Sequence, residues 1–401
     1  MQNHEINLGL RRIFALLERL DNPHLKLPPT IHIAGTNGKG STLSFLKFIF
    51  QESGLEVHAY TSPHLVKFNE RIVLANKEIC DDLLKQTLER CQKAANQKPK
   101  ITPTFFEITT AAAFLAFSKI KADILLLETG LGGRLDATNV LPKVLCSIIT
   151  PIDFDHQEFL GKTLKKIAFE KAGIMKKNCP VVIGKQKKEV LEVLENQAYR
   201  LGCKIRILGK DFFVRKNLTK NIGLIGTHQI DNATVAIEAI KLQKKFKIKK
   251  ENIISAVQKT SWPARLQKIS DGKFVEKLPK NFELHLDGSH NLQGAKTILE
   301  FLKSQKNKKI FVIFGMLKNK NYEGFLKLIA KKIDQLIAIE IPDEVNSCKA
   351  NEIQKIAKNN KINAIIAKNF DDAFDKIKCD EDALILICGS LYLAGVFLED
   401  N

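Results

Sequence analysis

The chain has 401 residues, 44% hydrophobic and 27% charged, and at roughly 150 residues per domain it is expected to fold as about two or three domains. This composition excludes a disordered or fibrous protein. The formal net charge of +19 comes mainly from lysines scattered along expected helices. Because Arg-rich tracts and interleaved aromatic residues are missing, the charge favours a solvated surface over nucleic-acid binding.

The eight cysteines form no C-x-x-C pair, so they predict reduced thiols in a cytoplasmic protein rather than a zinc ribbon or a disulfide framework. Residues 1–10 lack the apolar core of a secretory signal. Apolar runs such as residues 124–127 and 383–388 have the length of strands, far short of the roughly 20 residues of a membrane helix. We therefore expect neither export nor a membrane-spanning segment.

The first part of the chain alternates strand and helix patterns. An apolar strand over residues 30–34 runs into a glycine-rich loop over residues 35–42, and then into a helix. Further strands are expected over residues 57–60, 123–128, 144–150, 181–184 and 205–208. Helices are expected over residues 81–96, around Phe114, and over residues 232–246 and 251–259. This alternation predicts a mostly parallel sheet covered by helices.

A second α/β pattern begins after Trp262. Strands are expected over residues 283–286, 309–314, 335–339 and 384–388, and helices over residues 292–303 and 322–333. We therefore predict an α/β fold with two domains. Residues 1–262 would form a P-loop ATPase-like domain with a mostly parallel sheet, and residues 263–401 a smaller C-terminal Rossmann-like α/β domain.

The loop over residues 35–42 is the strongest local signal for chemistry. Small residues allow backbone N–H groups to surround phosphates at a helix N-terminus, and Lys39 would supply a positive charge. The loop departs from the common phosphate-loop pattern, because Ile33 stands where a first glycine is expected and Gly40 separates Lys39 from Ser41. The preceding strand and following helix nevertheless favour a nucleotide loop over a chance turn.

Polar residues also follow two other expected strands. Glu128 ends an apolar strand and opens the glycine-rich segment 130–136, where a carboxylate is well placed to hold Mg²⁺. His156 follows the strand 144–150 and could either ligate a metal or complete a hydrogen-bond network. Lys171 lies on a short helical segment, and its local sequence alone assigns it no role.

Several motifs in order then resemble one family over nearly the whole chain. They are Gly35–Ser41, Thr61–Leu65, Phe68–Ile72, Gly130–Asn139, Glu170–Ile174, Gly226–Gln229 with Asn232, Trp262–Arg265 and Leu286–Asn291. Together they are similar to folylpolyglutamate synthase and dihydrofolate synthase of the Mur ligase superfamily. The family commonly has Gly where Ala264 stands and Ala where Ser289 stands, and both changes are between small residues.

The resemblance implies an enzyme of folate biosynthesis and one-carbon metabolism, an ATP-dependent ligase that forms an acyl phosphate and couples it to L-glutamate. It implies catalytic roles for Lys39, Glu128, His156 and Lys171. It implies ATP contacts at Thr36, Asn37, Gly38, Lys39, Gly40, Ser41, Asn232, Arg265 and Asp287.

The resemblance further implies two Mg²⁺ ions. Ser62 and Glu128 would hold one ion, and His156 with a carbamoylated Lys171 would lie near the second. The pterin or folate part of the substrate is implied at Ile6, Asn7, Leu8, Thr104, Phe105, Phe106, Glu107, Leu135, Asp136 and Ala137. The substrates would be ATP, L-glutamate and dihydropteroate or reduced folates, and we expect a monomer with no nucleic-acid or membrane partner.

Two alternatives stay open. A Mur-type peptidoglycan ligase carries a similar lysine-containing loop, but it usually has an additional N-terminal domain, and only about thirty residues precede the loop in this sequence. A basic nucleic-acid-binding protein with an incidental phosphate loop is the remote alternative.

Overall fold

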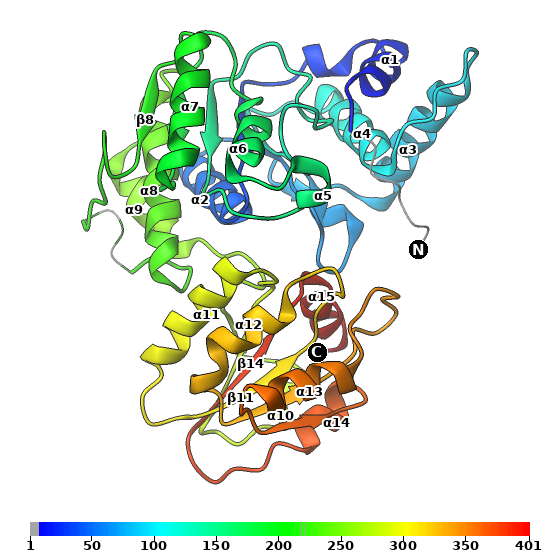
Figure 1. The fold of residues 1–401 in the computed structure, drawn as a ribbon. Helices are drawn as coiled ribbons and strands as arrows, with labels where there is room; N and C mark the ends of the chain where they lie inside the picture. Colours follow the sequence, from blue (N-terminus) through cyan, green and yellow to red (C-terminus); the bar gives the residue numbers. More distant parts are fainter. Residues whose placement is uncertain (1–7, 218, 220) are drawn as a thin grey trace. The chain divides into compact units, whose positions relative to one another are not determined.

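The computed structural model describes residues 8–217, 219 and 221–401, which Figure 1 shows as a ribbon. The chain divides into two compact units. Unit 1 comprises residues 1–223 and 229–260, and unit 2 comprises residues 224–228 and 261–401.

Unit 1 is built on an eight-stranded sheet in the order β4-β3-β2-β5-β1-β6-β7-β8. Its strands are β1 (Thr30–Ala34), β2 (Val57–Tyr60), β3 (Ile72–Leu74), β4 (Lys77–Glu78), β5 (Ile124–Glu128), β6 (Cys146–Ile149), β7 (Val181–Ile183) and β8 (Ile205–Ile207). Strands β2, β5, β1, β6, β7 and β8 pair in parallel. Strands β3 and β4, at one side of the sheet, pair in the antiparallel direction.

The helices of unit 1 surround this sheet. They are α1 (Arg11–Arg19), α2 (Lys39–Glu52), α3 (Asp81–Asn96), α4 (Phe105–Lys119), α5 (Gln157–Leu160), α6 (Leu164–Ala172), α7 (Lys188–Arg200), most of α8 (Thr227–Leu242) and α9 (Lys250–Lys259), with short 3₁₀ turns η1 (Pro23–Leu25) and η2 (Phe68–Arg71). Figure 1 shows α1, α3 and α4 grouped together, and their buried residues belong to one apolar core. A second core joins α6 and α7 to β6, β7 and β8.

The centre of this sheet sets the position of the site. Every residue of β1, β5 and β6 is buried, as expected for parallel strands covered on both faces. The register pairs Ile33 with Glu128, and Ala34 with Ile149. The loops that follow β1, β5 and β6 therefore leave the sheet at the same carboxyl edge, where open α/β sheets bind ligands.

Unit 2 has a six-stranded sheet in the order β13-β12-β11-β14-β10-β9. Its strands are β9 (Gln267–Ile269), β10 (Phe282–Leu286), β11 (Lys309–Phe314), β12 (Gln335–Ala338), β13 (Ala364–Ile366) and β14 (Ala383–Cys388). Its helices are α10 (Lys273–Glu276), α11 (Leu292–Ser304), α12 (Tyr322–Ile329) with the 3₁₀ turn η3 (Ala330–Lys332), α13 (Ala350–Asn359), α14 (Phe370–Asp375) and α15 (Leu391–Asp400).

The interior of unit 2 contains two kinds of packing. One core joins α11, α12 and α13 to the sheet. An aromatic cluster joins α10, α14 and α15, where the ring centroids of Phe274 and Phe374 lie 4.6 Å apart and those of Phe274 and Phe397 lie 5.6 Å apart. Strand β9 is antiparallel to β10, whereas the other strands pair in parallel.

The predicted fold class, with a mostly parallel sheet and a second α/β domain, is confirmed. The antiparallel strands β3, β4 and β9 were not predicted. The helix predicted over residues 232–246 runs instead over Thr227–Leu242. It ends early because the Gln243 side chain donates to Phe246 O at 2.7 Å and accepts from Phe246 N at 2.8 Å, which closes a turn.

Two further features concern the chain as a whole. All eight cysteines lie among the described residues and are free thiols. Within residues 8–217, 219 and 221–401, no helix has both the length and the apolar character needed to cross a bilayer.

Candidate active site

The loop between β1 and α2 requires glycine at two positions. Gly35 has φ +152°, and a Cβ there would lie 1.8 Å from Thr150 Oγ1. Gly38 has φ +86°, and a Cβ there would lie 2.6 Å from Asn232 Oδ1. A side chain at either position would collide with its neighbour. Asn232, predicted from a distant motif, therefore lies directly against the loop.

The backbone of the loop is anchored on the segment after β6. The amides of Thr36 and Asn37 donate to Pro151 O at 3.0 and 3.2 Å. The Thr36 hydroxyl donates to Asp153 O at 3.0 Å. Because two amides are used in this way, the N–H groups left to meet an anion are those at the start of α2, which have no intrahelical acceptor.

Lys39, the first residue of α2, lies over the loop. Its Nζ donates to Thr36 O at 3.4 Å and is 3.8 Å from Glu128 Oε1. Glu128 ends β5 and is buried. Ser62 follows the adjacent parallel strand β2, so the sheet brings its segment to the same edge as Glu128. The structure thus joins three separate motifs at one edge of the sheet.

Lys171 is buried in α6 with only 5% of its surface exposed. Its Nζ donates to Gly35 O at 2.7 Å. Burial, and then the nearby Lys39 charge, lower the pKa of Lys171 to about 7, while Asp155 and Asp136 act in the opposite direction. An exposed surface lysine was equally compatible with the local sequence, but the structure buries this amine against the loop, with its pKa close to neutral.

His156 precedes the short helix α5 as its N-cap residue, with φ +48°. Its Nε2 lies 3.7 Å from Asp155 Oδ2, and 39% of its side chain is exposed. Asp155 is also one of the charges that act on Lys171. The segment after β6 therefore places Pro151 and Asp153 against the loop, and it places Asp155 close enough to act on the charge of Lys171.

Asp136, predicted as a substrate contact, is enclosed within its own loop. Its carboxylate accepts from Leu131 N at 2.7 Å and from Thr138 N at 3.0 Å, and also from the Thr138 hydroxyl. Burial raises the pKa of Asp136. The Thr138 hydroxyl lies 2.9 Å from Nε2 of buried His32. These bonds fix the segment that carries Leu135 and Ala137.

The predicted substrate segment 104–107 caps α4. The Thr104 hydroxyl accepts from Glu107 N at 3.2 Å, and Thr104 N donates to Glu107 Oε2 at 2.7 Å. Glu107 Oε2 also accepts a hydrogen bond from Arg12 Nε at 2.9 Å. A Cβ on Gly130 would lie 2.3 Å from Phe106 Cζ, so the segments 104–107 and 130–137 are in contact. Phe105 is exposed.

The remaining predicted substrate residues lie near the N-terminus. Leu8 packs partly buried against the core that contains α6 and α7. Ile6 and Asn7 lie outside the described residues.

Glu70 is a residue to which the sequence assigned no role. Its carboxylate accepts from the amides of Leu65, Val66 and Lys67 at 2.7 to 2.9 Å, which fixes the loop that follows Ser62. The neighbouring Arg71 donates to His64 Nδ1 at 2.8 Å. The sequence offers one signal, which is the charged pair Glu70 and Arg71 just after a Pro-containing loop. The three backbone amides that Glu70 accepts from could not be identified without the backbone conformation.

In unit 2, Asp287 is buried at the end of β10 and organises the turn that carries Arg265. Its Oδ2 accepts from Leu266 N and its Oδ1 from Ser289 N, both at 2.8 Å. Ala264 has φ +54° and Leu266 has φ +49°. A left-handed alanine costs about 1 kcal/mol, and Asp287 helps to hold this turn in place. A direct contact of Asp287 with ATP stays a prediction.

The ligand atoms that the predicted metal-binding residues offer decide which metal ions this site can hold. The Glu128 carboxylate and the Ser62 hydroxyl are hard oxygen ligands that suit Mg²⁺. His156 supplies a nitrogen, which Mg²⁺ favours less, and an ammonium on Lys171 cannot ligate a cation at all. The residues present therefore fit one Mg²⁺ directly, and they fit a second ion once Lys171 carries an oxygen-bearing group.

Two family models match the chain. The Mur ligase middle domain matches residues 33–240, and the dihydrofolate synthetase C-terminal domain matches residues 271–399. A dihydrofolate synthase/folylpolyglutamate synthase of Bacillus subtilis is 34% identical, and the alignment covers 96% of this chain and 93% of that protein.

Solved structures agree with these matches. E. coli FolC in complex with DHPP and ADP has a TM-score of 0.88 at 25% identity, over 99% of this chain and 94% of that one. A bifunctional folylpolyglutamate synthase/dihydrofolate synthase with Mn, AMPPNP and L-glutamate bound has a TM-score of 0.85 at 26% identity, over 99% of this chain and 95% of that one.

Proposed function

Because the chain belongs to the dihydrofolate synthase/folylpolyglutamate synthase family, we propose that it is an ATP-dependent ligase adding L-glutamate to dihydropteroate, to reduced folates, or to both. The observation that carries this proposal is the loop 35–38, on which Lys39, Lys171 and Asn232 converge from three helices. The C-terminal match to dihydrofolate synthetase favours this substrate class over a peptidoglycan precursor.

The proposed reaction has two steps. A substrate carboxylate oxygen attacks the γ-phosphorus of ATP, the bond to the β-phosphate oxygen breaks, and ADP leaves an acyl phosphate. The glutamate nitrogen then attacks the acyl carbon, inorganic phosphate departs, and the nitrogen loses a proton. Neither step requires a covalent bond to the protein, so the chain contributes position and charge.

The residues of unit 1 support these contributions. The N-terminal amides of α2 and the Lys39 ammonium would neutralise the negative charge of the β- and γ-phosphates. Asn232 would close the loop from the side of α8, and the proposed ATP contact of Arg265 rests on its sequence motif. Mg²⁺ held by Glu128 and Ser62 would polarise the phosphate oxygens.

Lys171 is proposed to be carbamoylated. Its neutral amine attacks CO₂, a bond forms between Nζ and carbon, one C=O electron pair moves to oxygen, and the nitrogen releases a proton. The lowered pKa supports this step, since only the unprotonated amine is nucleophilic. The carbamate would supply oxygen ligands to a second Mg²⁺ near His156, which the ammonium cannot do.

The acceptor is proposed to bind beside segments 104–107 and 135–137, with Leu8 and the flanking residues Ile6 and Asn7. The contact between Phe106 and Gly130 supports one continuous surface. Exposed Phe105 offers an aromatic face for a pterin ring, while buried Glu107 and Asp136 hold the backbone of the two segments. The protein is proposed to act as a monomer.

A paired assay tests the function. Purified protein is given ATP, Mg²⁺ and L-glutamate with dihydropteroate in one reaction and with tetrahydrofolate in another. ADP and a glutamylated product are expected in equal amounts in at least one reaction. ATP hydrolysis without a glutamylated product from either acceptor would exclude the proposal.

Removing the proposed metal ligands gives a separate prediction. Glu128→Ala and His156→Ala should each lower kcat by about tenfold or more and weaken the response to Mg²⁺, because each removes a ligand at the rim of the sheet. Thermal melting checks that both variants fold. Full activity in a variant that melts at a much lower temperature would show that the residue is structural.

Glu70 provides a prediction about positioning. In Glu70→Gln the amide group can no longer accept from all three backbone amides as a charged carboxylate does, so the Ser62 loop loosens. The Mg²⁺ concentration for half-maximal rate should rise by about threefold to tenfold, with kcat largely restored at saturating Mg²⁺. Glu89→Gln, on an exposed part of α3, is the control. An unchanged Mg²⁺ response would contradict the role.

A further inference from the structure

A histidine lies inside the central sheet of unit 1. His32 is on β1, with none of its surface exposed. Its Nε2 lies 2.9 Å from the Thr138 hydroxyl, and that hydroxyl donates to Asp136 Oδ1. These three side chains therefore form a buried chain of hydrogen bonds, which runs from the strand before the nucleotide loop to the segment 135–137.

The order of donors and acceptors in this chain assigns the tautomer of His32. The Thr138 hydroxyl has one proton, which it donates to the Asp136 carboxylate. The hydroxyl oxygen can then only accept from the imidazole, so the hydrogen is on Nε2. Nδ1 of His32 has no hydrogen-bond partner among the described residues. The opposite tautomer would place an N–H there, which would be a buried donor without an acceptor.

The imidazole of His32 is also uncharged. Burial, and then the nearby charge of Lys176, lower the pKa of His32 to about 3. The Lys176 ammonium donates to Asn139 O at 3.4 Å, next to Thr138 in the sequence. His32 is therefore a neutral donor at neutral and mildly acidic pH.

The other end of the chain is the Asp136 carboxylate. It also accepts from Leu131 N at 2.7 Å and from Thr138 N at 3.0 Å. Several donors from different directions leave the carboxylate one orientation. The Thr138 hydroxyl can rotate, and it serves as one of these donors because the N–H of His32 occupies the acceptor side of its oxygen. His32 thus acts on Asp136 through Thr138.

Strand β1 connects this chain of hydrogen bonds to the nucleotide loop. His32 pairs with Leu127 on β5 and with Ser147 on β6, so its position is fixed from both sides. The strand ends at Ala34, and the loop begins at the next residue. An acceptor carboxylate has to meet the γ-phosphate closely, and a displacement of about 1 Å can lower the rate about a hundredfold. The segment 135–137 is therefore held from the same strand that carries the phosphate loop.

We propose that His32 and Thr138 are positioning residues for the acceptor substrate. The N–H of His32 orients the Thr138 hydroxyl, and this hydroxyl holds Asp136 and the segment 135–137 in place relative to the nucleotide loop. This role rests on the ligase function proposed above, in which that segment contacts the acceptor. Neither side chain has to touch a reactant, since both act from inside the sheet.

The order of the hydrogen bonds can be tested without an activity assay. The full chain is labelled with ¹⁵N-histidine, and long-range ¹⁵N–¹H spectra report the imidazoles. The His32 signal is the one that is missing in His32→Gln. We expect a neutral Nε2–H tautomer that stays unchanged between about pH 5.5 and pH 8. An Nδ1–H tautomer, or conversion to an imidazolium in this range, would overturn the proposal.

Steady-state kinetics test the positioning role. His32→Leu and Thr138→Val each remove one member of the chain. The KM for the acceptor should rise about tenfold, because the loss of one buried hydrogen bond changes an affinity by about that factor, while the KM for ATP should change less than about twofold. His32→Gln keeps an N–H and Thr138→Ser keeps the hydroxyl, so both should recover most of the acceptor affinity. Thermal melting checks that each variant folds.

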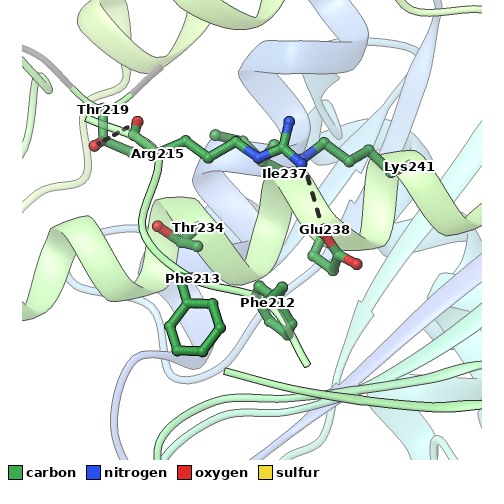
Figure 2. A pocket seen from close by; sticks show the side chains of 8 residues that line it. All are labelled: Phe212, Phe213, Arg215, Thr219, Thr234, Ile237, Glu238 and Lys241. Carbon is green, nitrogen blue, oxygen red and sulfur yellow. Dashed lines mark hydrogen bonds and ion pairs between the residues drawn. The ribbon is translucent and has the colours of Figure 1, made fainter. Parts of the chain in front are cut away.

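Thr234→Val is the matched control. Figure 2 shows Thr234 on α8, where it is buried and its hydroxyl donates to Ile230 O at 2.7 Å within the same helix. This variant makes the same substitution at a buried threonine outside the segment 135–137, so its acceptor KM should equal that of the parent even if its Tm falls.

The kinetic outcomes separate this role from the proposed function. An active parent whose acceptor KM is unchanged in Thr138→Val, or whose KM values for acceptor and ATP rise together, would overturn the positioning role alone. A parent that forms no glutamylated product would exclude the ligase function, and the acceptor role with it, whichever tautomer His32 has.

Discussion

Lys39→Ala is expected to lower the rate of ligation by about a hundredfold to a thousandfold or more. Lys39 is the one loop side chain that places a positive charge over the start of α2, within 3.8 Å of Glu128. Charge develops on the phosphate oxygens during transfer, and removing one fixed group that meets such charge has effects of this size. Steady-state production of ADP and glutamylated product measures the change.

Two comparisons make the Lys39 result interpretable. Lys39→Arg retains the charge but replaces the compact ammonium, so it should recover only part of the rate. Lys188→Ala removes an exposed lysine at the start of α7 and should be fully active. If Lys39→Ala stays within about twofold of the parent while its Tm is unchanged, the loop does not bind the reacting phosphates.

Lys171→Ala is expected to be nearly inactive, with a loss comparable to that of Lys39→Ala. The Lys171 amine is enclosed against Gly35 O, and a carbamate on it would carry the negative charge that a second metal ion needs. Short carboxylates such as formate or acetate should restore part of the activity by filling the vacated space. Rate measurements with and without added acetate check this result.

The modification itself can be observed. Native mass spectra of protein kept in bicarbonate should show one added carboxyl group, which Lys171→Ala lacks. Lys166→Ala, an exposed position on the same helix, should retain both the added mass and the activity. An unmodified, fully active parent protein in CO₂-free buffer would contradict the carbamate and leave Lys171 as a cationic phosphate ligand.

Local sequence patterns were sufficient to predict the strands, the loop and the helix that hold the site. The strand over Thr30–Ala34, the glycine loop and the helix from Lys39 follow one another within a few residues, and each has its own periodic or glycine signal. The acid at Glu128 was identified because it ends an unbroken apolar strand. These features depend on neighbours in the sequence, so they could be predicted without the fold.

The features that the sequence did not predict depend on contacts between distant segments. The burial of Lys171 follows from the packing of α6 on the loop, and its helix carries a similar lysine at Lys166 that is exposed. Glu70 and Asp287 act through backbone amides, whose positions depend on turns that no side-chain pattern specifies. Strand β9 pairs in the antiparallel direction with β10, about fifteen residues later, and a pattern of three residues is too short to predict that pairing.

The acyl-phosphate step is the central claim, and isotope transfer tests it most directly. The acceptor carboxylate is labelled with ¹⁸O, and the protein is given ATP, Mg²⁺ and L-glutamate. If the carboxylate takes the γ-phosphoryl group before the glutamate nitrogen attacks, one labelled oxygen must leave with each inorganic phosphate as the amide forms. Phosphate carrying one ¹⁸O for every glutamylated product is the predicted result. Unlabelled phosphate formed together with the glutamylated product would contradict the mechanism.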